Sequence, residues 1–399
     1  MFHRLSRLAA VLAFGTALAV VAPACGGSAK GSTSVKKKSK KSDKKAQLAK
    51  ARAAAKDGDT DEADAAYQAA YAIDQDFDVL EEHVDFLIHA GRATRAQEVA
   101  RTFYEDHKPD PKAFDIYAEA LIAATKGPEA LEIADAMVSL DADDPAGHEK
   151  RGRAKLLLGK EQEGIDELRR AVQLEPKNGT YHMALGTALH DLGQVNDAAL
   201  EFRAALKASP DDPQTHVLLG MALRDQGELE ESKQQLEKAL ELDPDNGRAY
   251  FELGLLYNRR GKQADAESAL SKAVQKSPNE SLFWYAYGEI YRLQDRSDEA
   301  LAAYRKAVDL DPPYPKAIAK LGAILVERKQ YDDAEAFLIQ SIRRDKKNPS
   351  NYLNLGAVYV VKKKSRLALE NFEKFLDLAP KGDPDRARAR AAIAELKGR

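Results

Sequence analysis

The feature that most constrains the fold is a column of glycines spaced 34 residues apart, without an insertion or deletion between them. Its members are Gly152, Gly186, Gly220, Gly254, Gly288, Gly322 and Gly356. A fixed period of this length is the signature of a stacked repeat array, in which each unit buries its apolar face against its neighbours. The 399 residues therefore need no single large core.

From about residue 43 the chain divides into ten units of 34 residues. These units start near 43, 77, 111, 145, 179, 213, 247, 281, 315 and 349. In the unit from 247, Leu253 and Gly254 belong to one apolar run at helical spacing, and Ala266 and Leu270 belong to a second. Proline ends most second runs, as at Pro176, Pro210, Pro244, Pro278, Pro312 and Pro380. Each unit is thus predicted to be a helix-turn-helix.

The repeated residues resemble the tetratricopeptide repeat. Two units carry nearly the whole pattern: Trp284-x2-Tyr287-Gly288-x2-Tyr291, and Tyr352-x2-Leu355-Gly356-x2-Tyr359 with Ala368-x3-Phe372 and Pro380. The resemblance implies an all-α fold, a right-handed α-α superhelix over residues 46–382, with residues 383–399 as a capping helix. Residues 46–76 are either a degenerate first repeat or a plain helical hairpin.

The first 25 residues are predicted to be a signal peptide. Arg4 and Arg7 precede an apolar run from Leu8 to Val21, and Cys25, the one cysteine, follows Ala24 directly. This arrangement resembles a bacterial lipoprotein signal, which implies lipidation of Cys25, although Ala22 stands where that family usually has leucine. The alternative is ordinary cleavage after Ala24.

The charge of the chain is unevenly placed. Residues 1–45 hold ten Lys or Arg against one acid, so residues 46–399 carry a net charge of -12. The lysine- and serine-rich residues 26–45 predict a disordered tether. The acidic body argues against nucleic acid as a partner, because phosphate binding needs Lys and Arg on the binding face.

By resemblance, the first helix of each repeat lines a concave groove that holds a protein or peptide segment. The alternative is that these side chains only complete the packing between repeats. The family's chaperone-tail clamp is not expected, because Phe251, Leu255 and Ala286 occupy positions that it needs. The predicted partner-binding residues are Met183, Val217, Met221, Arg224, Phe251, Leu255, Asn258, Tyr285 and Arg292.

His148, His182 and His216 are also spaced by 34 residues, at the slot that Trp284 and Tyr352 occupy in later units. Equivalent residues of neighbouring repeats lie on the order of 10 Å apart, which is too far for one shared metal ion. We therefore expect packing residues and no metal or cofactor site. The chain has no catalytic motif and is predicted not to be an enzyme.

The sequence thus favours a non-enzymatic protein-protein interaction scaffold. The preferred interpretation is an outer-membrane lipoprotein facing the periplasm, anchored through acylated Cys25, that assists assembly of an envelope complex of the pilus or secretion type. Alternatives are a soluble periplasmic or secreted adaptor, and a recruiting subunit for envelope polysaccharide synthesis. The sequence does not specify the partner or the oligomeric state.

Lipidation of Cys25 can be tested by metabolic labelling with a fatty-acid analogue. We expect incorporation into the native chain and none into Cys25→Ala, because the thiol is the acyl acceptor. Label that persists in Cys25→Ala would contradict the assignment.

Overall fold

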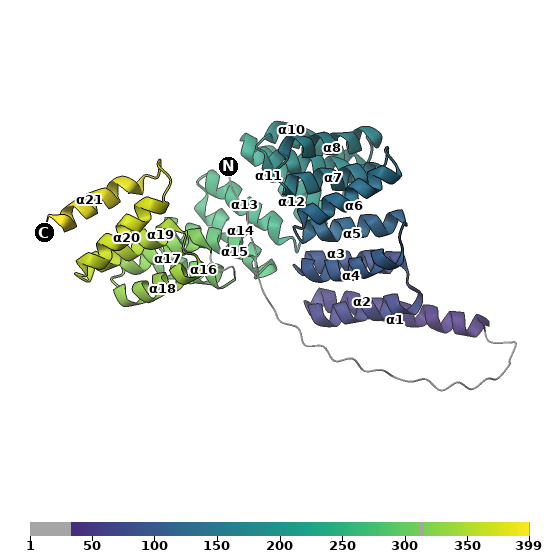
Figure 1. Ribbon diagram of the computed structural model, residues 1–399, viewed down its shortest axis with the longest axis horizontal. Coiled ribbons are helices and arrows are strands. Elements are labelled where there is room, and N and C mark those ends of the chain that lie inside the picture. Colours follow the sequence, from purple (N-terminus) through teal and green to yellow (C-terminus); the bar gives the residue numbers. More distant parts are fainter. Residues whose placement is uncertain (1–32, 311–313, 399) are drawn as a thin grey trace. The chain divides into compact units, whose positions relative to one another are not determined.

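The computed structural model describes residues 33–310 and 314–398, which form 21 α-helices and no strand (Figure 1). The helices are α1 (Thr33–Asp57), α2 (Thr60–Asp74), α3 (Phe77–His89), α4 (Ala93–Asp106), α5 (Pro111–Ala123), α6 (Gly127–Leu140), α7 (Pro145–Leu157), α8 (Glu161–Leu174), α9 (Gly179–Asp191), α10 (Val195–Ala208), α11 (Pro213–Gln226), α12 (Leu229–Leu242), α13 (Gly247–Arg259), α14 (Gln263–Lys276), α15 (Ser281–Leu293), α16 (Ser297–Leu310), α17 (Pro315–Glu327), α18 (Tyr331–Arg344), α19 (Pro349–Val361), α20 (Ser365–Leu378) and α21 (Asp385–Lys397).

The helices follow the predicted register. From α3 onward the first helix of each pair begins at residue 77, 111, 145, 179, 213, 247, 281, 315 or 349. Side chains that precede most of these helices cap them: Asp212 accepts from the backbone N–H of Thr215 at 2.8 Å, and Asn246 accepts from that of Ala249 at 3.0 Å. The all-α repeat fold predicted from the sequence is confirmed.

Helix α21 closes the carboxyl end of the array, as predicted. Ala389 is buried, and Ile393 and Leu396 pack against the preceding core. Arg386 donates to the carbonyl oxygens of Leu376 at 2.6 Å and Ala379 at 2.7 Å, two acceptors near the end of α20. These bonds satisfy carbonyls that a helix end leaves without an intrahelical partner.

The glycine column is where the two helices of a repeat cross most closely. A Cβ atom on Gly254 would lie 2.6 Å from Cγ of Leu270, and one on Gly288 would lie 2.7 Å from the ring of Tyr304. The same relation joins the other glycines of the column to the residue sixteen positions later: Leu168, Phe202, Leu236, Leu338 and Phe372. The residue sixteen positions later therefore fills the space that a side chain on the glycine would occupy.

The chain divides into two compact units, one ending at Ala100 and the other beginning at Arg101. In the first unit, Tyr67 and Ala51 are buried in a small core against which Leu48 and Phe86 pack. The Tyr67 hydroxyl donates to Glu82 at 2.9 Å. Residues 46–76, which the sequence left open between a repeat and a plain hairpin, contain the last twelve residues of α1 and all of α2 as an antiparallel pair.

The start of α1 corrects the predicted tether. The sequence predicts disorder over residues 26–45, but the helix begins at Thr33. Lysine has a good helix propensity, and Lys44 pairs with Asp74 at 2.7 Å and with Asp76 at 2.6 Å. The prediction is therefore wrong for residues 33–45. The signal sequence, Cys25, residues 26–32 and Pro312 lie outside the described residues.

Replacing Gly254 by alanine should destabilise the α13–α14 pair by about 1–3 kcal/mol, since the new methyl group overlaps Leu270. Gly322→Ala is the matched control, because its nearest atoms are flexible side-chain ends at 3.1 Å. Hydrogen exchange measured by mass spectrometry should show faster exchange in α13 and α14 for Gly254→Ala than in α17 and α18 for Gly322→Ala. Equal effects would contradict the close-crossing account.

Candidate functional site

The first helices of consecutive repeats contact one another directly. Contacts join α5 to α7, α7 to α9, α9 to α11, α11 to α13, α13 to α15 and α17 to α19. In the described part of the chain, no two second helices pack together to a comparable extent. We call the side on which the first helices meet the inner face, and the predicted partner-binding residues all belong to these helices.

Two of the predicted groove residues lie inside the packing between repeats. Phe251 is 3% exposed and stacks on Phe283 of the next repeat, with ring centroids 4.5 Å apart. Val217, at the same repeat position, is 4% exposed. The sequence predicts both as groove-lining residues, but the structure places them where they join neighbouring repeats. Neither offers surface to a partner in this conformation.

Four other predicted residues are half-buried, so part of each side chain remains accessible: Met183, Met221, Leu255 and Asn258. The hydroxyl of Thr215 lies 3.6 Å from the sulfur of Met183. The Arg248 guanidinium lies 3.6 Å from the sulfur of Met221. Met183, Met221 and Leu255 give the inner face an apolar character between α9 and α13.

Arg224, also predicted to bind a partner, is engaged in a charge network. It pairs with Glu252 of the next first helix and, at 2.9 Å, with Asp225. The Glu252 side chain is 1% exposed and also accepts from Arg248 at 2.7 Å. Such a buried carboxylate needs both cations, since an unpaired buried charge costs several kcal/mol. Arg224 therefore links α11 to α13, whereas Arg248 remains 46% exposed.

Tyr285 is half-buried on α15 and packs against two other tyrosines. Its ring centroid lies 5.7 Å from that of Tyr304 and 5.5 Å from that of Tyr314, which meets it edge-on. The third position of the next repeat is Ala317, too small to stack on the ring as Phe283 stacks on Phe251. Burial, followed by the nearby charge of Glu289, raises the pKa of the Tyr285 hydroxyl to about 12.

Glu289, one turn after Tyr285, contacts side chains from three helices. It accepts a hydrogen bond from the Tyr304 hydroxyl of α16, pairs with Arg292 at 3.1 Å and lies 3.4 Å from the Lys320 ammonium of α17. Burial alone would raise the pKa of Glu289, but these hydrogen bonds and cationic charges outweigh it and lower that pKa. The sequence-based prediction includes Arg292 but not Glu289, its partner, nor Lys320, the second cation that contacts Glu289.

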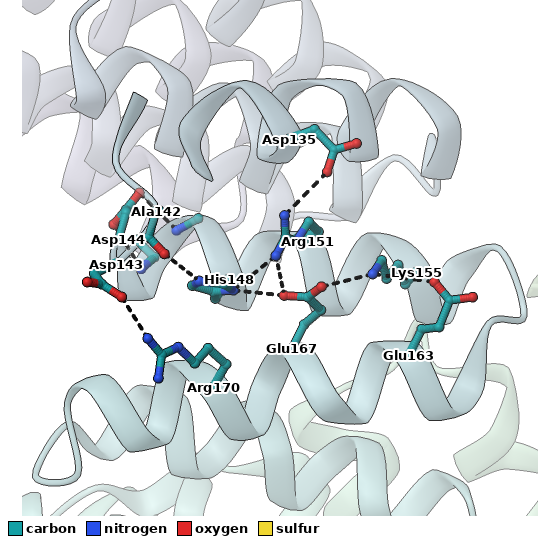
Figure 2. Close-up of polar contacts among 12 residues, drawn as sticks. Asp135, Ala142, Asp143, Asp144, His148, Arg151, Lys155, Glu163, Glu167 and Arg170 are labelled. Carbon is teal, nitrogen blue, oxygen red and sulfur yellow. Dashed lines mark hydrogen bonds and ion pairs between the residues drawn. The ribbon is translucent and has the colours of Figure 1, made fainter. Parts of the chain in front are cut away.

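The histidine column has a structural role that Figure 2 shows for His148. Its Nδ1 lies 2.8 Å from Glu167 of α8, and its Nε2 lies 3.1 Å from the Ala142 carbonyl oxygen before α7. Arg151 and Lys155 also contact the Glu167 carboxylate, at 2.7 Å and 2.8 Å. The His148 ring, on α7, therefore links the turn before α7 to helix α8.

The same arrangement recurs in other repeats. A ring at this position reaches the carbonyl oxygen six residues earlier: His182 to Pro176 at 3.1 Å, His216 to Pro210 at 2.9 Å, Trp284 to Pro278 at 2.8 Å and Tyr352 to Lys346 at 3.0 Å. The imidazole nitrogens are thus engaged by the fold. Among the described residues, no group of three or more His, Cys, Asp or Glu is placed to hold a metal ion.

The described residues also bear on membrane attachment. None of their helices combines the length and apolar character that crossing a bilayer requires. Cys25, at which the sequence predicts lipidation, lies outside the described residues.

Glu289→Gln should lower stability by roughly 2 kcal/mol at neutral pH, because charge-assisted hydrogen bonds are lost. The depressed pKa of Glu289 means that its contribution is present above the ordinary glutamate pKa of about 4.3 and is lost as pH falls through the folded value. The difference in melting temperature between wild type and variant should therefore shrink below about pH 4. Glu327→Gln, at an exposed position of α17, is the control. A difference that persists unchanged in acid would contradict the account.

Comparison with protein families identifies the repeats. Models described as "Tetratricopeptide repeat" match residues 45–77, 150–213 and 217–281. A further model, the middle TPR-like domain of cilia and flagella-associated protein 70, matches residues 276–378. Comparison with curated protein sequences found no match.

Solved structures share the fold at low sequence identity. Yeast Tom70 is similar with a TM-score of 0.52 and 15% identity, over 90% of this chain and 96% of that one. A monomeric mutant of IFIT1 with m7Gppp-AAAA has a TM-score of 0.51 and 17% identity, over 82% of this chain and 89% of that one. At such identities the likeness concerns the fold alone. Together with the matched family models, it establishes that the chain is built of tetratricopeptide repeats.

Proposed function

We propose that this protein is a membrane-anchored scaffold whose inner face holds a segment of a partner protein while an envelope complex is assembled. Tetratricopeptide repeats are protein-protein interaction modules, which supports the scaffold role. The anchoring and the envelope location are supported by the lipoprotein-like sequence that ends at Cys25. The preferred location is the outer membrane, with the array facing the periplasm.

The observation that carries the proposal is the mixed surface of α11, α13 and α15. Leu255 and Met221 are half-buried, Leu282 is 39% exposed, and Arg248 is exposed beside them. Apolar side chains left accessible on consecutive helices, with charged groups at their edge, form the kind of surface that receives an extended or helical peptide.

A non-catalytic role fits the same surface. The carboxylates of the inner face are taken up by ion pairs, as Glu252 is by Arg224 and Arg248. In catalytic sites, by contrast, titratable groups are held near the substrate with their charge available for proton transfer. Recruitment of a partner therefore suits these helices better than chemistry.

The test is an affinity capture from crosslinked membranes with the full chain as bait. Leu255→Glu combined with Leu282→Glu should reduce the captured partner roughly tenfold, because two carboxylates are introduced on the apolar part of the inner face. Leu200→Glu is the matched control, since Leu200 is 61% exposed on the second helix α10. Circular dichroism of each variant checks that the array still folds.

If a folded Leu255→Glu/Leu282→Glu bait keeps every partner, the inner face is not the binding surface. If bait from cells expressing Cys25→Ala is found in the soluble fraction with its partner still bound, the scaffold role stands and the anchoring role is confirmed as separate. Retention of Cys25→Ala in the membrane fraction would contradict anchoring through that residue.

A further inference from the structure

Two cations share one carboxylate on the inner face of α15 and α17. Arg292 and Lys320 have Glu289 as their one acidic partner among the described residues. The side chains of Arg292 and Lys320 are 42% and 37% exposed, while that of Glu289 is 23% exposed. The cluster therefore presents a surplus positive charge on its accessible side.

The donors of these cations are only partly used. Arg292 reaches Glu289 through Nε at 3.4 Å and Nη2 at 3.1 Å, and a guanidinium has five N–H donors in all. The Lys320 ammonium, with three donors, makes a single contact at 3.4 Å. Glu289 in turn also accepts from the Tyr304 hydroxyl, so its own acceptor capacity is divided among three groups. Arg292 and Lys320 therefore have N–H donors left over.

Apolar surface lies nearer the amino end of the same helix, ten residues before Arg292. Leu282 is 39% exposed and stands one turn before Tyr285 on the same helix. The phenolic hydroxyl of Tyr285 has no hydrogen-bond partner within the part of the chain that the structure describes, although its ring is packed against Tyr304 and Tyr314. A hydroxyl held in this way can donate to an incoming oxygen.

The surrounding charge limits what can bind there. Residues 46–399 carry a net charge of -12, which repels an extended polyanion such as a nucleic acid. A short peptide with one or two carboxylates beside an apolar side chain avoids that repulsion and still meets the local positive surplus. Arg292 can receive a carboxylate in a bidentate fashion, which adds geometric specificity.

We propose that Arg292, Lys320 and the Tyr285 hydroxyl receive an aspartate or glutamate side chain of the partner segment, while an apolar side chain further along that segment lies on Leu282. The proposal rests on the proposed function, of which it specifies the partner chemistry. Arg292 and Lys320 select for negative charge, and Leu282 with Tyr285 supplies apolar contact area.

The test measures binding of fluorescein-labelled peptides to the purified array by fluorescence anisotropy. The probe alternates aspartate with leucine, and its companions alternate asparagine or lysine with leucine. The aspartate peptide should bind roughly tenfold more tightly than the asparagine peptide, and its affinity should fall as NaCl is added. Arg292→Gln combined with Lys320→Gln should abolish this preference.

Arg305→Gln combined with Lys306→Gln is the matched control. It removes the same two charges from exposed positions of the second helix α16 of the same repeat, so it should leave the preference intact. Tyr285→Phe should weaken binding of the aspartate peptide a few-fold with the array still folded, because only the hydroxyl is lost.

The outcomes separate this inference from the function on which it rests. Equal affinity for the aspartate and asparagine peptides, with both lost in Leu282→Glu, would overturn the carboxylate site and leave the inner face as a binding surface. An equal loss in the α16 control would also overturn it, since general electrostatic attraction would then explain the preference. Failure of all three peptides to bind would overturn the site, while the capture from membranes would still decide the scaffold role.

Discussion

The structure depends on how closely the two helices of each repeat cross. Glycine at one position of the first helix leaves room for a buried side chain of the second helix, as Gly186 does for Phe202 and Gly288 does for Tyr304. Both of these rings are fully buried. A side chain in place of the glycine would push the helices apart, and the shift would pass to the neighbouring repeat because each repeat packs only on its neighbours.

The close crossing also determines the character of the inner face. It brings each first helix near enough to the next for side chains to bridge them, as Arg224 does with Glu252 and Lys320 does with Glu289. These bridges neutralise part of the charge of the first helices. The surplus at Arg292 and Lys320 follows from two cations meeting at a single carboxylate.

The array could be predicted from the sequence because its information is local and repeated. A period of 34 residues with glycine, proline and apolar positions in fixed register gives the helix starts directly. The start of α1 could not be predicted in this way. Lys44 is held by Asp74 and Asp76, some thirty residues further along, and the composition of residues 26–45 contains no sign of these partners.

The candidate site was only partly predictable for the same reason. Tyr285 and Phe251 occupy the same repeat position, yet Phe251 is buried against Phe283 of the next repeat, whereas Ala317 stands at the corresponding position after Tyr285. Their exposure thus depends on pairs of positions in different repeats. Glu289 becomes the centre of a cluster only when α15, α16 and α17 are assembled, so no single position of the repeat pattern singles it out.

The most direct test of the central claim is site-specific photo-crosslinking in intact cells. A photo-reactive amino acid at Leu282 probes the inner face, and one at Leu200 probes an exposed position of a second helix. The account predicts a discrete crosslinked protein from Leu282 and none from Leu200. A crosslink to the same protein from Leu200 alone would show that the partner lies against the second helices, and it would contradict the inner face as the binding surface.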